Sequence, residues 1–170
     1  MLAETGVKVV VTAIVAIVML IRWRSWLEPL LVVASLVLEA MSFITITTIV
    51  ARPRPDLLRL DSSPVDSSFP SGHVAAAAAY SAIAVAIFWR TRTHWLRYTA
   101  VALAVLVPIL VSLARMYRGM HFFTDVVMGV VLGGASVLVT ALVLRHPAER
   151  RTTNDARRHH EPHDTMNLTT

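Results

Sequence analysis

Two short polar segments interrupt an otherwise apolar chain. One is the turn at 70–73, with the sequence Pro-Ser-Gly-His, and the other runs from Arg115 to Asp125. Together they supply arginines, histidines, a serine and a carboxylate. Arginine binds phosphate oxygens through two parallel hydrogen bonds, and histidine can act as a nucleophile or as a proton donor. These residue types indicate a site that could hold a phosphate group and attack it.

The spacing inside the longer segment suggests how a histidine could be activated. His121 and Asp125 are four residues apart, so they lie one turn apart if the residues after Met120 are helical. The carboxylate could then accept a hydrogen bond from one imidazole nitrogen and leave the other nitrogen free as a nucleophile.

The turn at 70–73 predicts the start of a helix. Ser71 suits the N-cap position, because Gly72 and His73 lead into a run of alanines with high helix propensity. The first backbone N–H groups of a helix form an anion site, which the helix dipole strengthens. Gly72 would allow close approach of a ligand to the backbone.

Composition indicates a membrane protein. The chain has 170 residues, 55% of them hydrophobic, which is more apolar than a soluble domain of this length. It has no cysteine, which excludes disulfides, thiolate metal sites and a cysteine nucleophile. The net charge of +5 comes from short arginine clusters between apolar runs. That pattern fits membrane topology better than nucleic-acid binding, so no nucleic-acid partner is expected.

Hydropathy predicts an all-α bundle of about five transmembrane helices, with the first retained rather than cleaved as a signal peptide. The expected helices cover 7–21, 29–50, 71–89, 98–114 and 126–144. Residues 1–145 would form the transmembrane domain, and 146–170 a disordered cytoplasmic tail. Gly129 and Gly133 have the spacing of a helix-packing motif that could also support a homodimer. Oligomeric state stays open.

The distribution of basic residues predicts the orientation of the spans. Two turns, at 22–24 and 90–97, and the tail from 145 carry ten of the sixteen Lys and Arg residues. With five spans these three segments share one side, which the positive-inside rule makes cytoplasmic. The polar motifs then all lie on the extracytoplasmic face of a cell membrane.

Three motifs in this chain resemble the signatures of the type 2 phosphatidic acid phosphatase family, the membrane lipid phosphate phosphatases related to acid phosphatases and vanadium haloperoxidases. The motifs are Arg54-Pro55, Pro70-Ser71-Gly72-His73 and Arg115-x5-His121-x3-Asp125. The resemblance is close over 51–134. It implies a helical membrane phosphatase that acts on a lipid phosphate without a metal or other cofactor.

The resemblance also implies a role for each motif residue. His121 would be the nucleophile that forms a phosphohistidine, with Asp125 orienting it and His73 as the general acid. Four residues would bind the phosphate: Arg54, Ser71, Gly72 and Arg115. Guanidinium groups would supply the positive charge that a two-metal phosphatase takes from its ions.

This chain departs from the family pattern near the first motif. Thr47 stands where the family usually has a lysine, so a phosphate-binding cation is missing unless Arg52 or Arg118 replaces it. Many relatives also have six spans, and the first of those six is absent from the pattern of this chain.

Glu39 lies inside the second apolar run; at membrane depth it is either functional or a paired residue that holds two helices together.

Two hypotheses of function follow. The first is a phosphatase that removes a terminal phosphate from a lipid of the undecaprenyl diphosphate, phosphatidylglycerol phosphate or phosphatidate class. The alternative is a non-catalytic membrane protein that binds or moves phospholipids with the same anion pocket. The substitution at Thr47 favours the alternative, whereas a binder has no need for the His121 and Asp125 pair.

Overall fold

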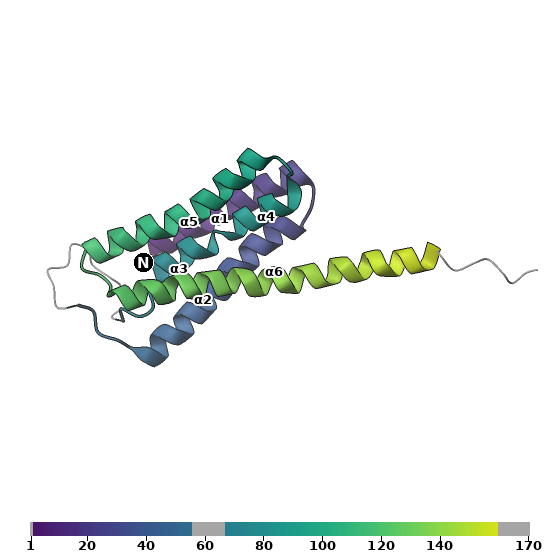
Figure 1. Cartoon of the computed structure of the whole chain (residues 1–170). Helices are drawn as coiled ribbons and strands as arrows, with labels where there is room; N and C mark the ends of the chain where they lie inside the picture. The colour runs from purple at the N-terminus through teal and green to yellow at the C-terminus, as the bar shows by residue number, and fades with distance from the viewer. Residues whose placement is uncertain (1, 56–66, 160–170) are drawn as a thin grey trace, which may run out of the picture.

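The computed structural model describes residues 2–55 and 67–159, with side chains for 6–55 and 67–145, and this part of the chain is helical without strands (Figure 1). The helices are α1 (Leu2–Trp23), α2 (Leu27–Val50), α3 (Gly72–Ala79), α4 (Ala82–Arg90), α5 (His94–Tyr117) and α6 (Phe123–His159). The predicted all-α architecture is therefore confirmed.

Five helical stretches within the described residues are long and apolar enough to cross a membrane. They are Gly6–Trp23, Leu27–Val50, Gly72–Arg90, His94–Tyr117 and Phe123–Arg145. This agrees with the five predicted spans and makes the chain a multi-pass membrane protein. Because consecutive spans run in opposite directions, the start of α1 lies at the same end of the bundle as the end of α2 (Figure 1).

The third span is two helices rather than the single helix expected over 71–89. The chain turns at Tyr80 and Ser81, where Ser81 N–H donates to the carbonyl of Ala78 and Ile83 N–H donates to that of Tyr80. These bonds reach back three residues instead of four, so they tighten the helix locally. The Tyr80 hydroxyl lies 2.9 Å from the Thr12 hydroxyl of α1. The sequence shows the polar residues Tyr80 and Ser81 at this position, but it did not predict that the helix would break there.

Helix α3 lies at the centre of the bundle. Helix α6 packs so closely against it that there is no room for a side chain at Gly129 or Gly133. A methyl group on Gly129 would lie 2.7 Å from the Ser71 carbonyl oxygen, and one on Gly133 would lie 2.2 Å from that of Ala75. The two glycines are thus used for packing inside one chain, and they are no longer available as the basis for a homodimer. Their contact holds the start of α3 against the start of α6.

Helices α1 and α5 form the outside of the bundle, with most of their apolar side chains exposed. A buried apolar cluster joins α1 to α2, α4 and α6 through six side chains: Met19, Leu31, Val32, Ala82, Ala86 and Val137. The exposed apolar surface of α1 and α5 is suited to contact with lipid hydrocarbon.

Helix α6 continues past the bundle to His159 (Figure 1). The tail predicted from the sequence begins at residue 146, so its first part, 146–159, belongs to this helix. Residues 160–170 lie outside the described part of the chain.

The α3–α6 contact yields a matched pair of substitutions. Gly133→Ala should destabilise the folded protein by about 1–3 kcal/mol, because the new methyl group meets backbone that cannot move aside. Gly134→Ala is the control, since a methyl group there meets nothing within 4 Å. Thermal unfolding in detergent should show a lower midpoint for the first variant and an unchanged or slightly higher one for the second. Equal midpoints would contradict the packing described here.

Candidate active site

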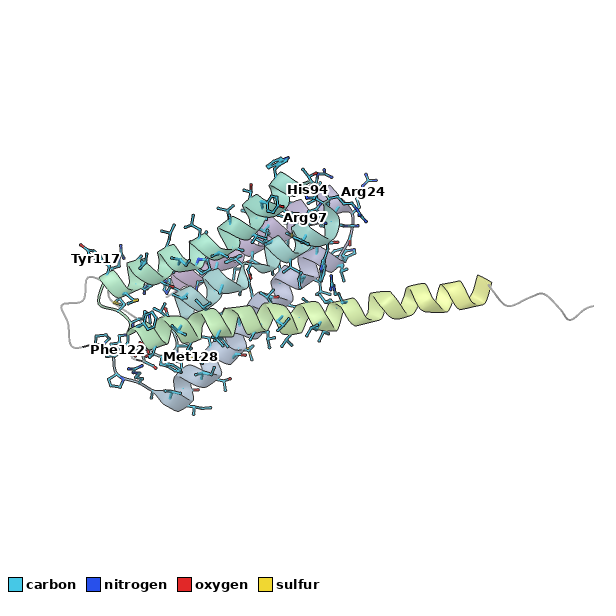
Figure 2. The ribbon with its side chains drawn as sticks, in the orientation of Figure 1. Arg24, His94, Arg97, Tyr117, Phe122 and Met128 are labelled. Atoms are coloured by element: carbon cyan, nitrogen blue, oxygen red, sulfur yellow. The ribbon has the colours of Figure 1, made fainter. Side chains whose placement is uncertain are left out.

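Three loops that are far apart in the sequence meet at one end of the bundle. Backbone hydrogen bonds join them: Ser68 N–H donates to the Arg52 carbonyl at 2.8 Å, and Ser71 N–H donates to the Asp125 carbonyl at 2.9 Å. Figure 2 shows Tyr117 and Phe122 at this end and Arg24, His94 and Arg97 at the other. The predicted convergence of the three motifs is thus present in the structure.

The local sequence explains why each loop leaves its helix. Helix α2 ends at Val50, and the C-cap residue Ala51 has a left-handed conformation with φ 42°. The prolines at 53 and 55 prevent further helix. Gly119, with φ 65°, turns the chain after α5. The Ser68 hydroxyl donates to the Pro53 carbonyl at 3.0 Å and ties the first loop to the second.

His121 lies just before α6 and is 7% exposed. Its Nδ1 atom is 2.7 Å from the carbonyl oxygen of Ser68. A carbonyl oxygen only accepts hydrogen bonds, so Nδ1 carries the proton of the neutral ring and Nε2 keeps its lone pair. The backbone of the second loop therefore selects the tautomer that a nucleophilic Nε2 requires.

Asp125 does not make the hydrogen bond to His121 that the spacing suggested. Its Oδ2 atom is 3.9 Å from His121 Nδ1, which is too long for a hydrogen bond. Oδ2 instead accepts from the backbone N–H of Phe122 at 2.8 Å and caps α6. Oδ1 forms an ion pair with Arg52 at 2.8 Å. The carboxylate thus acts on the imidazole through its charge, while the Ser68 carbonyl orients the ring.

The surroundings of His121 favour its neutral form. Burial, together with the charges of Arg54 and Arg115, lowers the pKa of His121 to about 4, although the Ser68 hydrogen bond and the Asp125 charge act in the opposite direction. The ring is therefore unprotonated at neutral pH. A nucleophile needs that state.

Arg54 is the arginine of the first motif that lies at the centre of the site. It is 8% exposed, and its guanidinium donates to the Met120 carbonyl at 2.8 Å and to the Ser67 carbonyl at 3.1 Å. Arg115 is half-buried in the last turn of α5. Both charges act on His121, which places these two predicted phosphate-binding residues beside the predicted nucleophile.

Arg52 links the first motif to the third. Its guanidinium donates to the Thr124 hydroxyl at 2.7 Å as well as to Asp125, and it lies 4.3 Å from the centre of the Phe122 ring. Arg118 is exposed at the end of α5. Arg52, one of the two candidates for the missing lysine charge, thus contacts Asp125 of the third motif.

Ser71, Gly72 and His73 begin α3, as predicted, with Ser71 at the N-cap. The Ser71 hydroxyl is buried and has no hydrogen-bond partner in the described part of the chain. A methyl group on Gly72 would lie 2.8 Å from the Phe43 ring, so a larger residue here would require that ring of α2 to shift. His73 is half-buried in the first turn of the same helix.

Two other candidates lie in α2. The Thr47 hydroxyl donates to the carbonyl of Phe69 at 3.4 Å. Thr47, which stands where the family usually has a lysine, therefore contacts the second loop. Glu39 is buried about 16 Å from the end of the helix, by the rise of about 1.5 Å per residue. It interacts electrostatically with Lys8 of α1. The structure does not bring Glu39 to the site.

Ser68 is the site residue that sequence reasoning missed. Its hydroxyl donates to the Pro53 carbonyl and its carbonyl contacts His121, yet the sequence analysis gave this residue no role. A backbone carbonyl can belong to any residue, so no sequence signal could have identified it.

Among the described residues, no three His, Cys, Asp or Glu side chains gather as a metal site would require.

The state of His121 can be measured directly. Long-range proton–nitrogen NMR spectra of histidine-labelled protein at pH 6 should show a neutral ring with the proton on Nδ1, because Ser68 accepts there and burial lowers the pKa. Loss of the signals in His121→Gln assigns them. A proton on Nε2, or a charged ring at pH 6, would contradict the geometry described here.

Comparisons with known proteins identify the family and the fold of the chain. The sequence profile of the PAP2 superfamily matches residues 28–147, which is most of the chain. A similar fold occurs in the crystal structure of a transmembrane PAP2-type phosphatidylglycerolphosphate phosphatase from Bacillus subtilis, with a TM-score of 0.72 and 24% identity over 82% of this chain and 73% of that one. No curated protein matches the chain. The chain belongs to the PAP2 superfamily, the family of the type 2 phosphatidic acid phosphatases.

Proposed function

We propose that this membrane phosphatase removes a terminal phosphate from a lipid through a phosphohistidine on His121. The supporting observation is a buried, neutral imidazole that has its Nδ1 proton bound by the Ser68 carbonyl. Its Nε2 lone pair is left for attack, and the charges of Arg54 and Arg115 lie close enough to act on the ring. Few structural roles would require this combination.

In the first step, Nε2 of His121 attacks phosphorus while the bond to the lipid oxygen breaks. His73 donates a proton to the leaving oxygen, and Arg54 and Arg115 balance the charge on the transferring phosphoryl group. The imidazole gains a positive charge as the P–N bond forms. Asp125, 3.9 Å from Nδ1, stabilises that charge.

In the second step, water attacks the phosphohistidine and the P–N bond breaks. His73, now neutral, accepts the proton of the water, so inorganic phosphate leaves and both histidines return to their starting states. The two guanidinium groups supply the positive charge throughout, and the proposed reaction uses no metal. Arg52, bound to Asp125, is the proposed replacement for the lysine that the family has at Thr47.

The substrate class is a lipid phosphate monoester or diphosphate. Phosphatidylglycerol phosphate, phosphatidate and undecaprenyl diphosphate all present the same terminal group. The similar Bacillus subtilis structure is that of a phosphatidylglycerolphosphate phosphatase, so phosphatidylglycerol phosphate is the first of these lipids to test.

The alternative is a phospholipid-binding or lipid-moving protein without catalysis, for which Thr47 in place of lysine is the favouring observation. Trapping separates the two functions. Brief mixing with phosphorus-32-labelled substrate should leave label on the wild-type chain that is stable to alkali and labile to acid, as a phosphohistidine is. A protein that only binds lipid would carry no covalent label.

Substitution of the two histidines tests their separate roles. His121→Ala should lower phosphate release by at least about a thousandfold, because no nucleophile remains. His73→Ala should lower it by roughly 10²–10⁴-fold with a lipid substrate. The label should still form in that variant from an aryl phosphate, whose leaving group needs no proton.

Arg92→Gln removes one positive charge at the opposite end of the bundle, so it is the control for the change in net charge and for losses during purification. All three variants should elute from a sizing column as the wild type does. Activity near the wild-type level in both histidine variants would end this mechanism while leaving the membership of the family intact.

We further propose that the site faces the extracytoplasmic side, with the C-terminus cytoplasmic. The chain has no cysteine, so single introduced cysteines report the side of the membrane. Tyr117→Cys, at a position 86% exposed beside the site, should react with an impermeant maleimide in intact cells. Arg92→Cys should react only after the cells are permeabilised. The opposite labelling pattern would reverse the orientation.

A further inference from the structure

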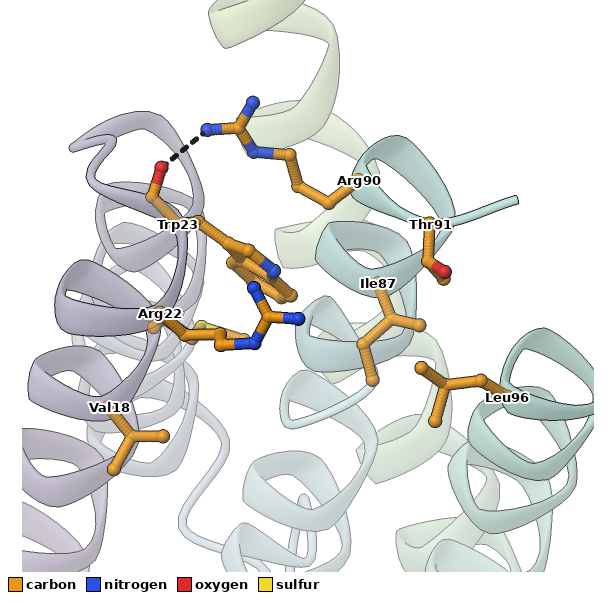
Figure 3. A pocket seen from close by; sticks show the side chains of 8 residues that line it. Val18, Arg22, Trp23, Ile87, Arg90, Thr91 and Leu96 are labelled. Atoms are coloured by element: carbon orange, nitrogen blue, oxygen red, sulfur yellow. Dashed lines mark hydrogen bonds between the residues drawn. The ribbon is translucent and has the colours of Figure 1, made fainter. Parts of the chain in front are cut away.

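A cavity lies at the end of the bundle opposite the candidate active site. It has a volume of about 360 Å³ and is formed by α1, α4 and the first turn of α5 (Figure 3). Its lining residues are Val18, Met19, Arg22, Trp23, Ile87, Arg90, Thr91 and Leu96. This volume is within the range of about 300–1,000 Å³ that small-molecule sites occupy.

The lining changes from apolar to cationic along the helix axis. On α1, Val18 and Met19 precede Arg22 by about one turn, and on α4 Ile87 precedes Arg90 by three residues. The arginines therefore lie nearer the helix ends, and the apolar residues lie deeper in the span. This order matches that of a phospholipid, with its charged group at the interface and its chains in the hydrocarbon.

The two arginines of the cavity differ in their partners. Arg90 is held by an ion pair with buried Glu28 at 2.8 Å and by a hydrogen bond to the Trp23 carbonyl at 3.0 Å. The Glu28 charge is thus matched by Arg90. Arg22 makes no hydrogen bond or ion pair within the described part of the chain, and its guanidinium points across the cavity toward Ile87 (Figure 3).

Neighbouring cations at this end do not compete for the same role. Arg97 lies over the Phe88 ring at 4.2 Å and donates to the Thr91 carbonyl at 2.6 Å, so its guanidinium is already bound. Arg92 is exposed, as Arg22 is, but it does not line the cavity. Arg22 is therefore the cavity cation that has no hydrogen bond or ion pair within the described part of the chain.

We infer that this cavity binds an anionic phospholipid from the leaflet at this end of the bundle. The phosphodiester would accept hydrogen bonds from Arg22, and one acyl chain would follow the apolar side chains between α1 and α4. Arginine is suited to phosphate oxygens, and basic pockets between transmembrane helices are suited to anionic headgroups. The apolar walls favour a lipid over a soluble phosphate. The inference does not depend on the catalytic mechanism proposed above.

Tryptophan fluorescence can test this inference, because Trp23 lines the cavity. In the full chain with Trp26, Trp89 and Trp95 changed to Phe, Trp23 is the single reporter. Dibrominated phosphatidylglycerol should quench it at a mole fraction at least about fivefold lower than dibrominated phosphatidylcholine. Phosphatidylglycerol is a phosphodiester and therefore not a substrate of the proposed phosphatase. Native mass spectrometry of the unaltered chain should retain phosphatidylglycerol in preference to phosphatidylcholine.

Arg22→Gln should reduce the preference for phosphatidylglycerol to less than twofold, whereas Arg92→Gln, which removes the same charge at the same end, should keep it. Arg22→Lys should give an intermediate preference, because an ammonium lacks the bidentate fork. Equal quenching by both lipids in the parent protein would overturn the inference. An equal loss in Arg92→Gln would also overturn it, as would displacement of the lipid by millimolar glycerol 3-phosphate.

Discussion

The hydrogen bond between His121 Nδ1 and the Ser68 carbonyl is the interaction on which the proposed chemistry of the site depends. It determines which ring nitrogen carries the proton, and burial beside two arginine charges keeps the ring neutral. A neutral ring with a free Nε2 lone pair is a nucleophile, whereas a charged ring is not. The arginines lower the pKa of the imidazole, and in the proposed reaction the same charges would stabilise a phosphate.

The second loop, which supplies the Ser68 carbonyl for that hydrogen bond, is held from three sides. Ser68 is tied to the first loop through its N–H and hydroxyl, and Ser71 is tied to the first turn of α6. Thr47 contacts the same loop from α2. Gly129 then lets α6 approach the start of α3 as closely as backbone contact permits. Packing inside the membrane therefore positions polar groups at its surface.

The sequence predicted the features that repeat along the chain or carry distinctive side chains. Apolar runs located the five spans, and the arginine and histidine motifs pointed to loops that meet at one end of the bundle, where the candidate site lies. It could not predict features that depend on backbone atoms or on competition between partners. Asp125 could have bonded to His121 by spacing alone, but Arg52 and the Phe122 N–H hold its oxygens. The break at Tyr80 and Ser81 and the role of Ser68 likewise have no compositional signature.

The position of the site at the rim of a bundle whose outer helices face hydrocarbon has a kinetic consequence. A lipid that is processed there need not leave the bilayer, because its headgroup can reach the loops while its tail remains among neighbouring lipids. Encounters then take place in two dimensions. The turnover of such an enzyme depends on how many substrate molecules there are per total lipid, and diluting the membrane with inert lipid slows it even when the bulk concentration is unchanged.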